Sequence, residues 1–256
     1  MRTYAIFFTN KSHKPMKKTA RIMALIVAMV CLPVVSKAQN FQLFYDTNRN
    51  CITTTWEMFR PDAFGSTFFF VDMDYGTNAP VRGRAIGAYT EIAREFCFWQ
   101  DTEFNWLSAH AEFNGGFNTQ NGSFNNAWLL GLTYSGHSED FSKTWSVTAS
   151  YKAIPGTIGL NLKKQPHSFQ LTGVWGISLL DGWCSFNGFV DFWREPRAWQ
   201  GTNFIFLTEP QLWINLNNLE GWEKINLSVG GELELSNNFA EKGFRAMPAL
   251  GAKWTF

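Results

Sequence analysis

Segments of about ten residues that alternate between apolar and polar side chains recur from Gln39 onward, and this alternation restricts the fold more than any other feature. In 107–114, Leu, Ala, Ala and Phe alternate with Ser, His, Glu and Asn. The segments 145–152 and 225–235 repeat the pattern. Successive side chains of a strand point to opposite faces, so a period of two predicts strands with one apolar and one polar face.

Twelve such segments can be placed along the chain, separated by clusters of Gly, Asn, Asp and Pro. They lie at about 40–46, 51–60, 66–75, 87–99, 104–114, 125–135, 143–154, 168–179, 184–194, 203–215, 223–235 and 244–256. Bacterial barrels built from one chain have an even number of antiparallel strands. We therefore predict an all-β fold, a transmembrane antiparallel up-and-down β-barrel of about 12 strands.

The connections between these segments predict an orientation. If the first strand rises, those at 100–103, 136–142, 180–183 and 216–222 face the periplasm and are short. Those at 76–86, 115–124, 155–167, 195–202 and 236–243 face outward and are longer. Short periplasmic turns and longer outer loops are typical of outer-membrane barrels.

The last segment, 244–256, ends in an aromatic residue and sets Leu250, Ala252, Trp254 and Phe256 on one face. This ending resembles the insertion signal of bacterial outer-membrane β-barrels, which implies that the barrel-assembly machinery recognises Phe256. The chain also has 12 Trp, 25 Phe and 6 Tyr. Aromatic residues favour strands and form the girdles where a barrel meets the lipid headgroups. A secreted β-sandwich is the soluble alternative.

The first 38 residues have the pattern of a secretory signal peptide. A basic stretch at 17–21 precedes an apolar stretch at 22–35, and Ser36-Lys37-Ala38 provides a small-x-small cleavage site. The apolar stretch is shorter than the about 20 residues that a transmembrane helix needs. We expect residues 1–38 to be removed, with Met16 as an alternative start, and residues 39–256 to form the barrel.

Cleavage would change the charge of the protein. Residues 1–38 hold seven basic and no acidic side chains, so 15 basic and 21 acidic residues remain. A nucleic-acid-binding surface needs an excess of basic residues. This composition argues against a nucleic-acid partner.

The polar face of each strand would line the lumen, because a charged side chain facing lipid costs about 2–4 kcal/mol for Arg or Lys near the bilayer centre. This parity gives the candidate lumen residues Glu57, Phe59, Phe70, Asp72, Asp74, Tyr89, Glu91, His110, Glu112, Asn114, Asp191 and Trp193. Arg94 has the wrong parity, so we expect a β-bulge to turn it inward or its side chain to reach the aromatic residues at 96–99. An alternative is that these charged groups pair with one another and close the lumen.

Three stretches, 53–62, 68–74 and 88–95, resemble in order and spacing the nucleoside-specific channel-forming (Tsx-type) outer-membrane family and uncharacterised relatives of it. The similarity is clearest over about residues 42–115. It implies a monomeric 12-stranded barrel that admits nucleosides through a narrow lumen. The positions carried over as lumen lining are Glu57, Phe59, Phe70, Asp72, Glu91 and Arg94.

We therefore expect a passive channel for small solutes, such as nucleosides, in the outer membrane of a Gram-negative bacterium. Its partners would be the solute and outer-membrane lipid, and we expect no cofactor, metal site or catalytic residue.

Two other classes of function stay open. An outer-membrane lipase or lipid A-modifying enzyme would need a Ser nucleophile beside a His base. The dipeptides at 137–138 and 167–168 place Ser and His on opposite faces of a strand, and Ser108 and His110 share the lumen face. A closed structural or adhesion barrel would use its outer loops, but those at 115–122 and 195–201 are modest in length.

Overall fold

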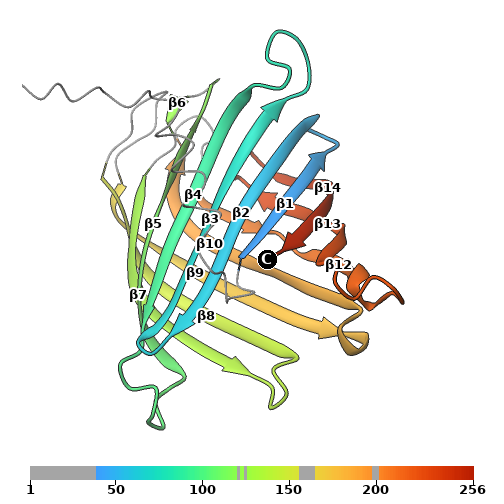
Figure 1. Ribbon diagram of the computed structural model, residues 1–256. Coiled ribbons are helices and arrows are strands. Elements are labelled where there is room, and N and C mark those ends of the chain that lie inside the picture. Colours follow the sequence, from blue (N-terminus) through green and yellow to red (C-terminus); the bar gives the residue numbers. More distant parts are fainter. Residues whose placement is uncertain (1–38, 120–121, 124–125, 156–164, 198–201) are drawn as a thin grey trace, which may run out of the picture. The chain divides into compact units, whose positions relative to one another are not determined.

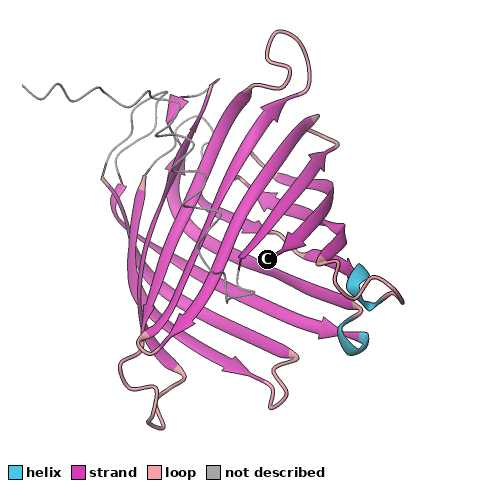
Figure 2. Ribbon diagram, in the orientation of Figure 1, coloured by secondary structure: helices cyan, strands magenta, loops and turns pink. Residues whose placement is uncertain are grey.

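The computed structural model describes residues 39–119, 122–123, 126–155, 165–197 and 202–256. The predicted signal peptide lies outside the described residues. The strands are β1 (Gln39–Asp46), β2 (Cys51–Asp62), β3 (Gly65–Gly76), β4 (Ala85–Phe96), β5 (Leu107–Asn118), β6 (Gly122–Ser123), β7 (Ala127–His137), β8 (Lys143–Ile154), β9 (Gln165–Leu179), β10 (Cys184–Arg197), β11 (Thr202–Thr208), β12 (Gln211–Asn215), β13 (Leu227–Asn237) and β14 (Phe244–Thr255). They form one antiparallel β-barrel (Figures 1 and 2). The only helical segments of the described residues are two 3-10 turns, Leu180–Gly182 and Leu216–Asn218.

The barrel has twelve strand positions, which confirms the predicted fold and strand number. β11 and β12 share one position, because both pair with β10 on one side and with β13 on the other. Glu209 and Pro210 separate them, and Pro210 has no N–H to donate to the sheet. The short strand β6 adds only a pairing with the end of β5.

The barrel closes where β14 meets β1. The two strands pair without interruption from Asn40 opposite Thr255 to Asp46 opposite Ala249. The N–H of Phe256 extends this ladder to the carbonyl of Gln39 at 3.0 Å. Closure leaves the sheet without an unpaired edge, which is the condition for a β-structure to lie in lipid.

The two ends of the barrel carry different connections. One end, called here the termini end, carries Gln39, Phe256 and the connections 63–64, 97–106, 138–142, 180–183 and 216–226. The other, the far end, carries the connections 47–50, 77–84 and 238–243 among the described residues. The loop 77–84 stands at the top of Figure 1. The termini end is the one that the sequence analysis assigned to the periplasm.

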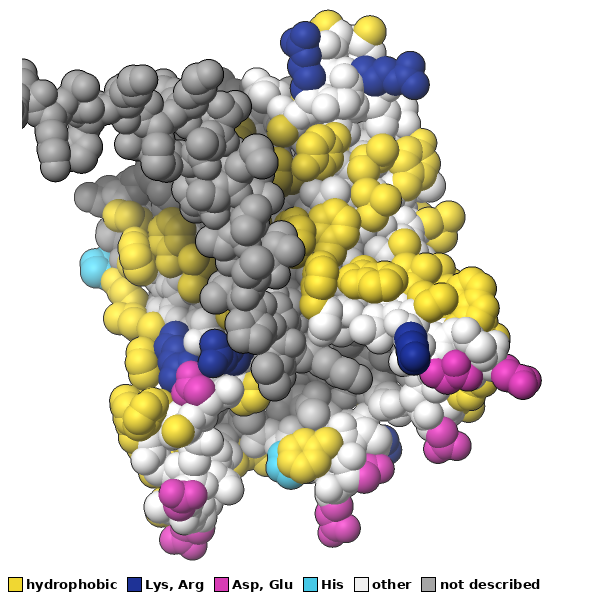
Figure 3. Space-filling view, viewed as in Figure 1, with side chains coloured by type: hydrophobic (Ala, Val, Ile, Leu, Met, Phe, Trp, Pro, Cys, Tyr) yellow, Lys and Arg dark blue, Asp and Glu magenta, His cyan; other side chains and the backbone are white. Residues whose placement is uncertain are grey.

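The outer face of the barrel is apolar. On β7 the outward residues Trp128, Leu130 and Leu132 are 57%, 63% and 58% exposed, whereas Leu129 and Thr133, which have the opposite parity, are buried. Figure 3 shows hydrophobic side chains along the middle of the visible wall and many of the charged ones towards its two ends. In the described part of the chain, no helix is long and apolar enough to cross a membrane.

Aromatic rings gather near both ends of the outer wall. Near the termini end, Trp56 packs against Phe41 and stacks on Phe256 with 5.7 Å between the ring centroids. Near the far end, Phe192 stacks on Phe204, again at 5.7 Å. Such belts place aromatic rings at the two headgroup regions of a bilayer.

Several boundaries differ from the sequence prediction. β4 ends at Phe96 and β5 begins at Leu107, because the indole N–H of Trp99 donates to the carbonyls of Phe104 and Leu107 and folds the segment between the strands into turns. The connection 97–106 is therefore long. The predicted contrast between short turns at one end and long loops at the other was wrong, and loop length does not orient this barrel.

Gly115 and Gly116 were expected in an outer loop but lie inside β5, opposite Thr90 and Tyr89. A Cβ atom on Gly116 would lie 2.2 Å from the carbonyl oxygen of Ala88. Glycine lets the two backbones approach closely here, and the turn signal carried by the Gly-Gly pair was misleading.

Candidate functional site in the barrel lumen

The barrel encloses a cavity of about 2310 Å³. Its lining includes Trp106 and Phe141 from connections at the termini end and Arg49 and Phe239 from connections at the far end. Between these ends the lining is built by the inward-facing residues of the strands. The cavity is therefore a candidate pathway from one end of the barrel to the other.

Most of the candidate residues meet in this cavity. Its lining includes Glu57, Phe59, Phe70, Asp72, Asp74, Tyr89, Glu91, His110, Glu112, Asn114, Asp191 and Trp193. They come from β2, β3, β4, β5 and β10, and each lies on the inward-facing side of its strand.

Arg94 lies on the outer face of β4, and the expected β-bulge is absent. The pairing of β3 with β4 is continuous from Gly65 to Asp74, so Arg94 keeps its outward parity opposite Thr67. Its guanidinium forms an ion pair with Asp62 at 2.6 Å and lies 5.5 Å from the ring centre of Phe96. Asp62 and Phe96 end their strands at the termini end, so the charge reaches the aromatic belt instead of the lumen.

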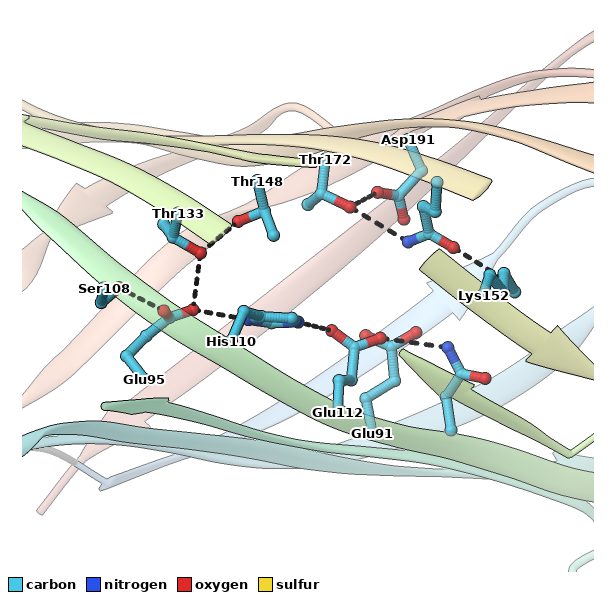
Figure 4. Close-up of polar contacts among 12 residues, drawn as sticks. Glu91, Glu95, Ser108, His110, Glu112, Thr133, Thr148, Lys152, Thr172 and Asp191 are labelled. Atoms are coloured by element: carbon cyan, nitrogen blue, oxygen red, sulfur yellow. Dashed lines mark hydrogen bonds and ion pairs between the residues drawn. The ribbon is translucent and has the colours of Figure 1, made fainter. Parts of the chain in front are cut away.

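His110 joins two carboxylates inside the barrel (Figure 4). Its Nδ1 lies 2.6 Å from Glu95 Oε1, and its Nε2 lies 3.1 Å from Glu112 Oε2. Glu95 also accepts hydrogen bonds from the hydroxyls of Ser108 and Thr133. Ser108, His110 and Glu112 share one face of β5, so the period of two in the sequence places all three on this wall.

A second polar network crosses β8, β9 and β10. The ammonium group of Lys152 donates to Gln170 Oε1 at 2.6 Å, Gln170 donates to Thr172 at 3.0 Å, and Thr172 donates to Asp191. Lys152 Nζ also lies 4.7 Å from the ring centre of Trp193. Lys152, Gln170 and Thr172 were not among the candidate residues, although Lys152 stands on the polar face of the alternating segment 145–152.

An aromatic row follows β3 and β4 inside the lumen. The rings of Phe68 and Phe70 lie 6.0 Å apart, and those of Phe70 and Tyr89 lie 5.9 Å apart. The hydroxyl of Tyr89 donates to Glu91 at 2.7 Å. This wall offers planar apolar surface beside a hydrogen-bonding group.

At the far end, Arg49 connects the turn 47–50 to the lumen wall. Its Nε lies 2.5 Å from Asp46, and its Nη1 lies 3.7 Å from Asp74. Burial works to lower the pKa of Arg49, but the hydrogen bond with Asp46 and nearby negative charge outweigh it and raise that pKa. The guanidinium therefore stays charged and holds the turn against the wall.

Three carboxylates lie along β13 and the break between β11 and β12. Glu232 and Glu234 face inward on β13, and Glu209 lines the same cavity from the break. Glu232 accepts a hydrogen bond from Gln211 at 2.9 Å. Glu209, Glu232 and Glu234 are called here the β13 carboxylates.

The other two histidines of the described residues bond to groups other than a Ser hydroxyl. His137 Nδ1 lies 2.8 Å from the backbone carbonyl of Ser138, and the His137 ring stacks on Phe141. His167 Nδ1 lies 2.7 Å from the hydroxyl of Tyr151 on the outer face. Among the described residues no group of three or more His, Cys, Asp or Glu is placed to hold a metal ion.

Comparison with solved structures shows the same fold. The NanC porin matches with a TM-score of 0.53 and 8% sequence identity, over 86% of this chain and 100% of that one. At this identity the likeness concerns the fold alone. LpxR from Salmonella typhimurium matches with a TM-score of 0.44 and 9% identity, over 86% of this chain and 100% of that one. The outer membrane channel DcaP of Acinetobacter baumannii matches with a TM-score of 0.38 and 11% sequence identity, over 81% of this chain and 63% of that one.

No curated protein matches the sequence. A family model does match, over residues 38–256, and its description is "Domain of unknown function (DUF5020)". The match covers every strand of the barrel. The resemblance to nucleoside-specific channels stays a prediction. The family match shows that the chain belongs to the DUF5020 family.

Proposed function

We propose that this protein is a passive channel for small solutes in the outer membrane of a Gram-negative bacterium. The observation that carries the proposal is a cavity of about 2310 Å³ whose lining includes residues from the connections at both ends of the barrel. A catalytic pocket needs access from one side only. A lining that reaches both ends is what passage through the barrel requires.

The outer wall and the sequence support the place of action. The exposed apolar band and the two aromatic belts match the surface of a barrel in lipid. The signal-peptide pattern of residues 1–38 would export the chain from the cytoplasm. We propose that the protein acts as a monomer, since each barrel encloses its own lumen.

The lining suits small solutes that combine an aromatic ring with hydrogen-bond donors, and nucleosides are one such class. A planar base could stack on the row formed by Phe68, Phe70 and Tyr89. The carboxylates beside that row accept hydrogen bonds from hydroxyl or amino groups. Twelve strands enclose a lumen between the filled eight-stranded barrels and the wide 16-stranded porins, which restricts passage to small molecules.

Liposome swelling tests this proposal. Purified protein is refolded into liposomes, and swelling rates are compared for nucleosides, sugars of similar size and amino acids. We expect uptake of small solutes, with nucleosides faster than sugars, and we expect Phe70→Ala to reduce this advantage. Equal rates for all solutes would contradict nucleoside preference and leave a general narrow channel.

Absence of uptake by a folded barrel would refute the channel itself. Circular dichroism and resistance of the unheated protein to SDS identify the folded barrel. Empty liposomes and liposomes with heat-unfolded protein provide the baseline.

A further inference from the structure

The charges that line the lumen are unequal. Among the described residues, thirteen carboxylates line the cavity, and four Lys or Arg side chains face them: Arg49, Lys152, Arg245 and Lys253. A narrow passage with walls of low dielectric focuses the field of such an excess. The lining as a whole therefore attracts cations and repels anions.

Some of these carboxylates already contact a basic side chain of the protein. Asp46 and Asp74 face Arg49, and Glu95 and Glu112 hold His110 between them. These contacts stabilise the wall and leave little capacity for a passing solute.

The β13 carboxylates differ from these matched groups. No ion pair to Lys or Arg is formed by Glu209, Glu232 or Glu234 within the part of the chain that the structure describes. Glu232 accepts its hydrogen bond from the amide of Gln211, which is a neutral donor. Three acidic groups thus share one wall of the lumen, and none of them forms an ion pair within the described residues.

One oxygen of this group lacks any hydrogen bond. Glu234 is only 9% exposed and lines the cavity, and its Oε1 atom is buried without a partner. Buried polar groups in folded proteins almost always have a partner, so an orphan acceptor on a side chain that lines the cavity indicates a place for a donor. Beside two further carboxylates, the donor that fits best is a cation.

We propose that the lumen selects cationic solutes and that the β13 carboxylates bind the protonated amine of a small organic cation as it passes. This inference rests on the proposed channel function and names the charge class of its solutes. Acidic side chains around a pore are a known means of cation selection. Amine-bearing solutes then pass more readily than neutral ones, and anions pass least.

The test compares three sugars that share a ring and differ in charge: glucosamine, glucose and glucuronate. Liposome uptake is measured for each, and the reversal potential across a planar bilayer is measured in a KCl gradient. The variant E232Q/E234Q removes two charges while it keeps side-chain volume. The control E139Q/E220Q removes two charges from exposed residues in the connections 138–142 and 216–226, outside the cavity.

We expect the wild-type protein to favour glucosamine over glucuronate and K⁺ over Cl⁻. E232Q/E234Q should reduce both preferences by about ten-fold, as expected for the removal of two unit charges within several Å of the solute. The control should leave both preferences as in the wild type. High salt should weaken the wild-type preference, because it screens the wall charges.

Conductance without a preference for cations would overturn this inference and leave the channel intact. An equal loss of preference in the control would also overturn it, since the general charge of the barrel would then be responsible. Absence of conductance and uptake by folded protein would refute the channel and this inference with it.

Discussion

Ala149 provides a direct test of whether the apolar outer wall faces lipid. It lies near the middle of β8 on the outer face, between Leu132 of β7 and Leu171 of β9. Replacing it with Arg adds a charge and keeps the Cβ atom of Ala. Near the centre of the bilayer, Arg on the lipid face of a barrel costs about 2–4 kcal/mol.

Ala153 is the matched control on the same strand and the same face, opposite Trp128. Four residues separate it from Ala149, which is about 13 Å along a strand. With a strand tilt of about 40°, this spacing moves the charge about 10 Å towards the headgroups, where the cost falls to about 0–1 kcal/mol. We expect Ala149→Arg to lower the free energy of unfolding by about 2 kcal/mol more than Ala153→Arg.

The assay is reversible guanidinium unfolding of the barrel in phospholipid vesicles, followed by tryptophan fluorescence. The same pair of variants in detergent micelles of smaller apolar thickness should show a smaller difference. Equal costs for the two variants in vesicles, or no cost for Ala149→Arg, would refute the placement of this wall in lipid.

Three further predictions concern local contacts. His110→Ala should lower the free energy of unfolding by about 1–3 kcal/mol, because it removes the imidazole that bonds to both Glu95 and Glu112 inside the barrel. Chemical denaturation measures this. Gly116→Val should destabilise by about 1–3 kcal/mol or block folding, because its Cβ would lie 2.2 Å from the carbonyl of Ala88; gel mobility of unheated protein reports the folded fraction. Hydrogen bonds from hydroxyl and amide groups of its own turn lower the pKa of Asp140 from 3.8 to about 2. Its stabilising effect should be complete above pH 4 and lost as the pH falls through 2, which carboxyl NMR and amide exchange of the turn would follow.

Each of these predictions has a result that would contradict it. His110→Ala with unchanged stability would mean that Glu95 is satisfied without the imidazole. Gly173→Ala is the control for Gly116, because its Cβ would meet only a side-chain methyl of Val190 at 3.0 Å. A normal carboxyl titration for Asp140 would show that the turn does not hold its charge.

Local alternation predicted the faces of the strands well. In β5, the sequence set Ser108, His110 and Asn114 on one face, and the structure buries all three inside the barrel. This succeeds because a strand turns successive side chains to opposite sides whatever surrounds it. The same rule placed twelve of the candidate residues in the lining.

Features that depend on neighbouring strands could not be predicted in this way. Whether Arg94 turned inward depended on a bulge, which is a property of the pairing between β3 and β4. Lys152 and Trp193 meet although they lie on β8 and β10, because β9 between them brings both to one wall. The sequence analysis predicted one strand over 203–215, although Pro210 lies within it. The structure breaks this strand at Glu209 and Pro210, whereas the neighbouring strands β10 and β13 continue past the break.

The seam between β1 and β14 has a consequence for how the protein is made. Asp46 pairs with Ala249, although about two hundred residues separate them in the chain, and the other pairs of the seam lie still further apart in sequence, so the seam closes the longest loop of the fold. Until β14 arrives, β1 exposes a full edge of unpaired N–H and C=O groups, which can pair with another chain. Productive folding thus requires that the unfolded polypeptide be kept from aggregating until its final strand is in place. A barrel stalled short of β14 would be an aggregation-prone species.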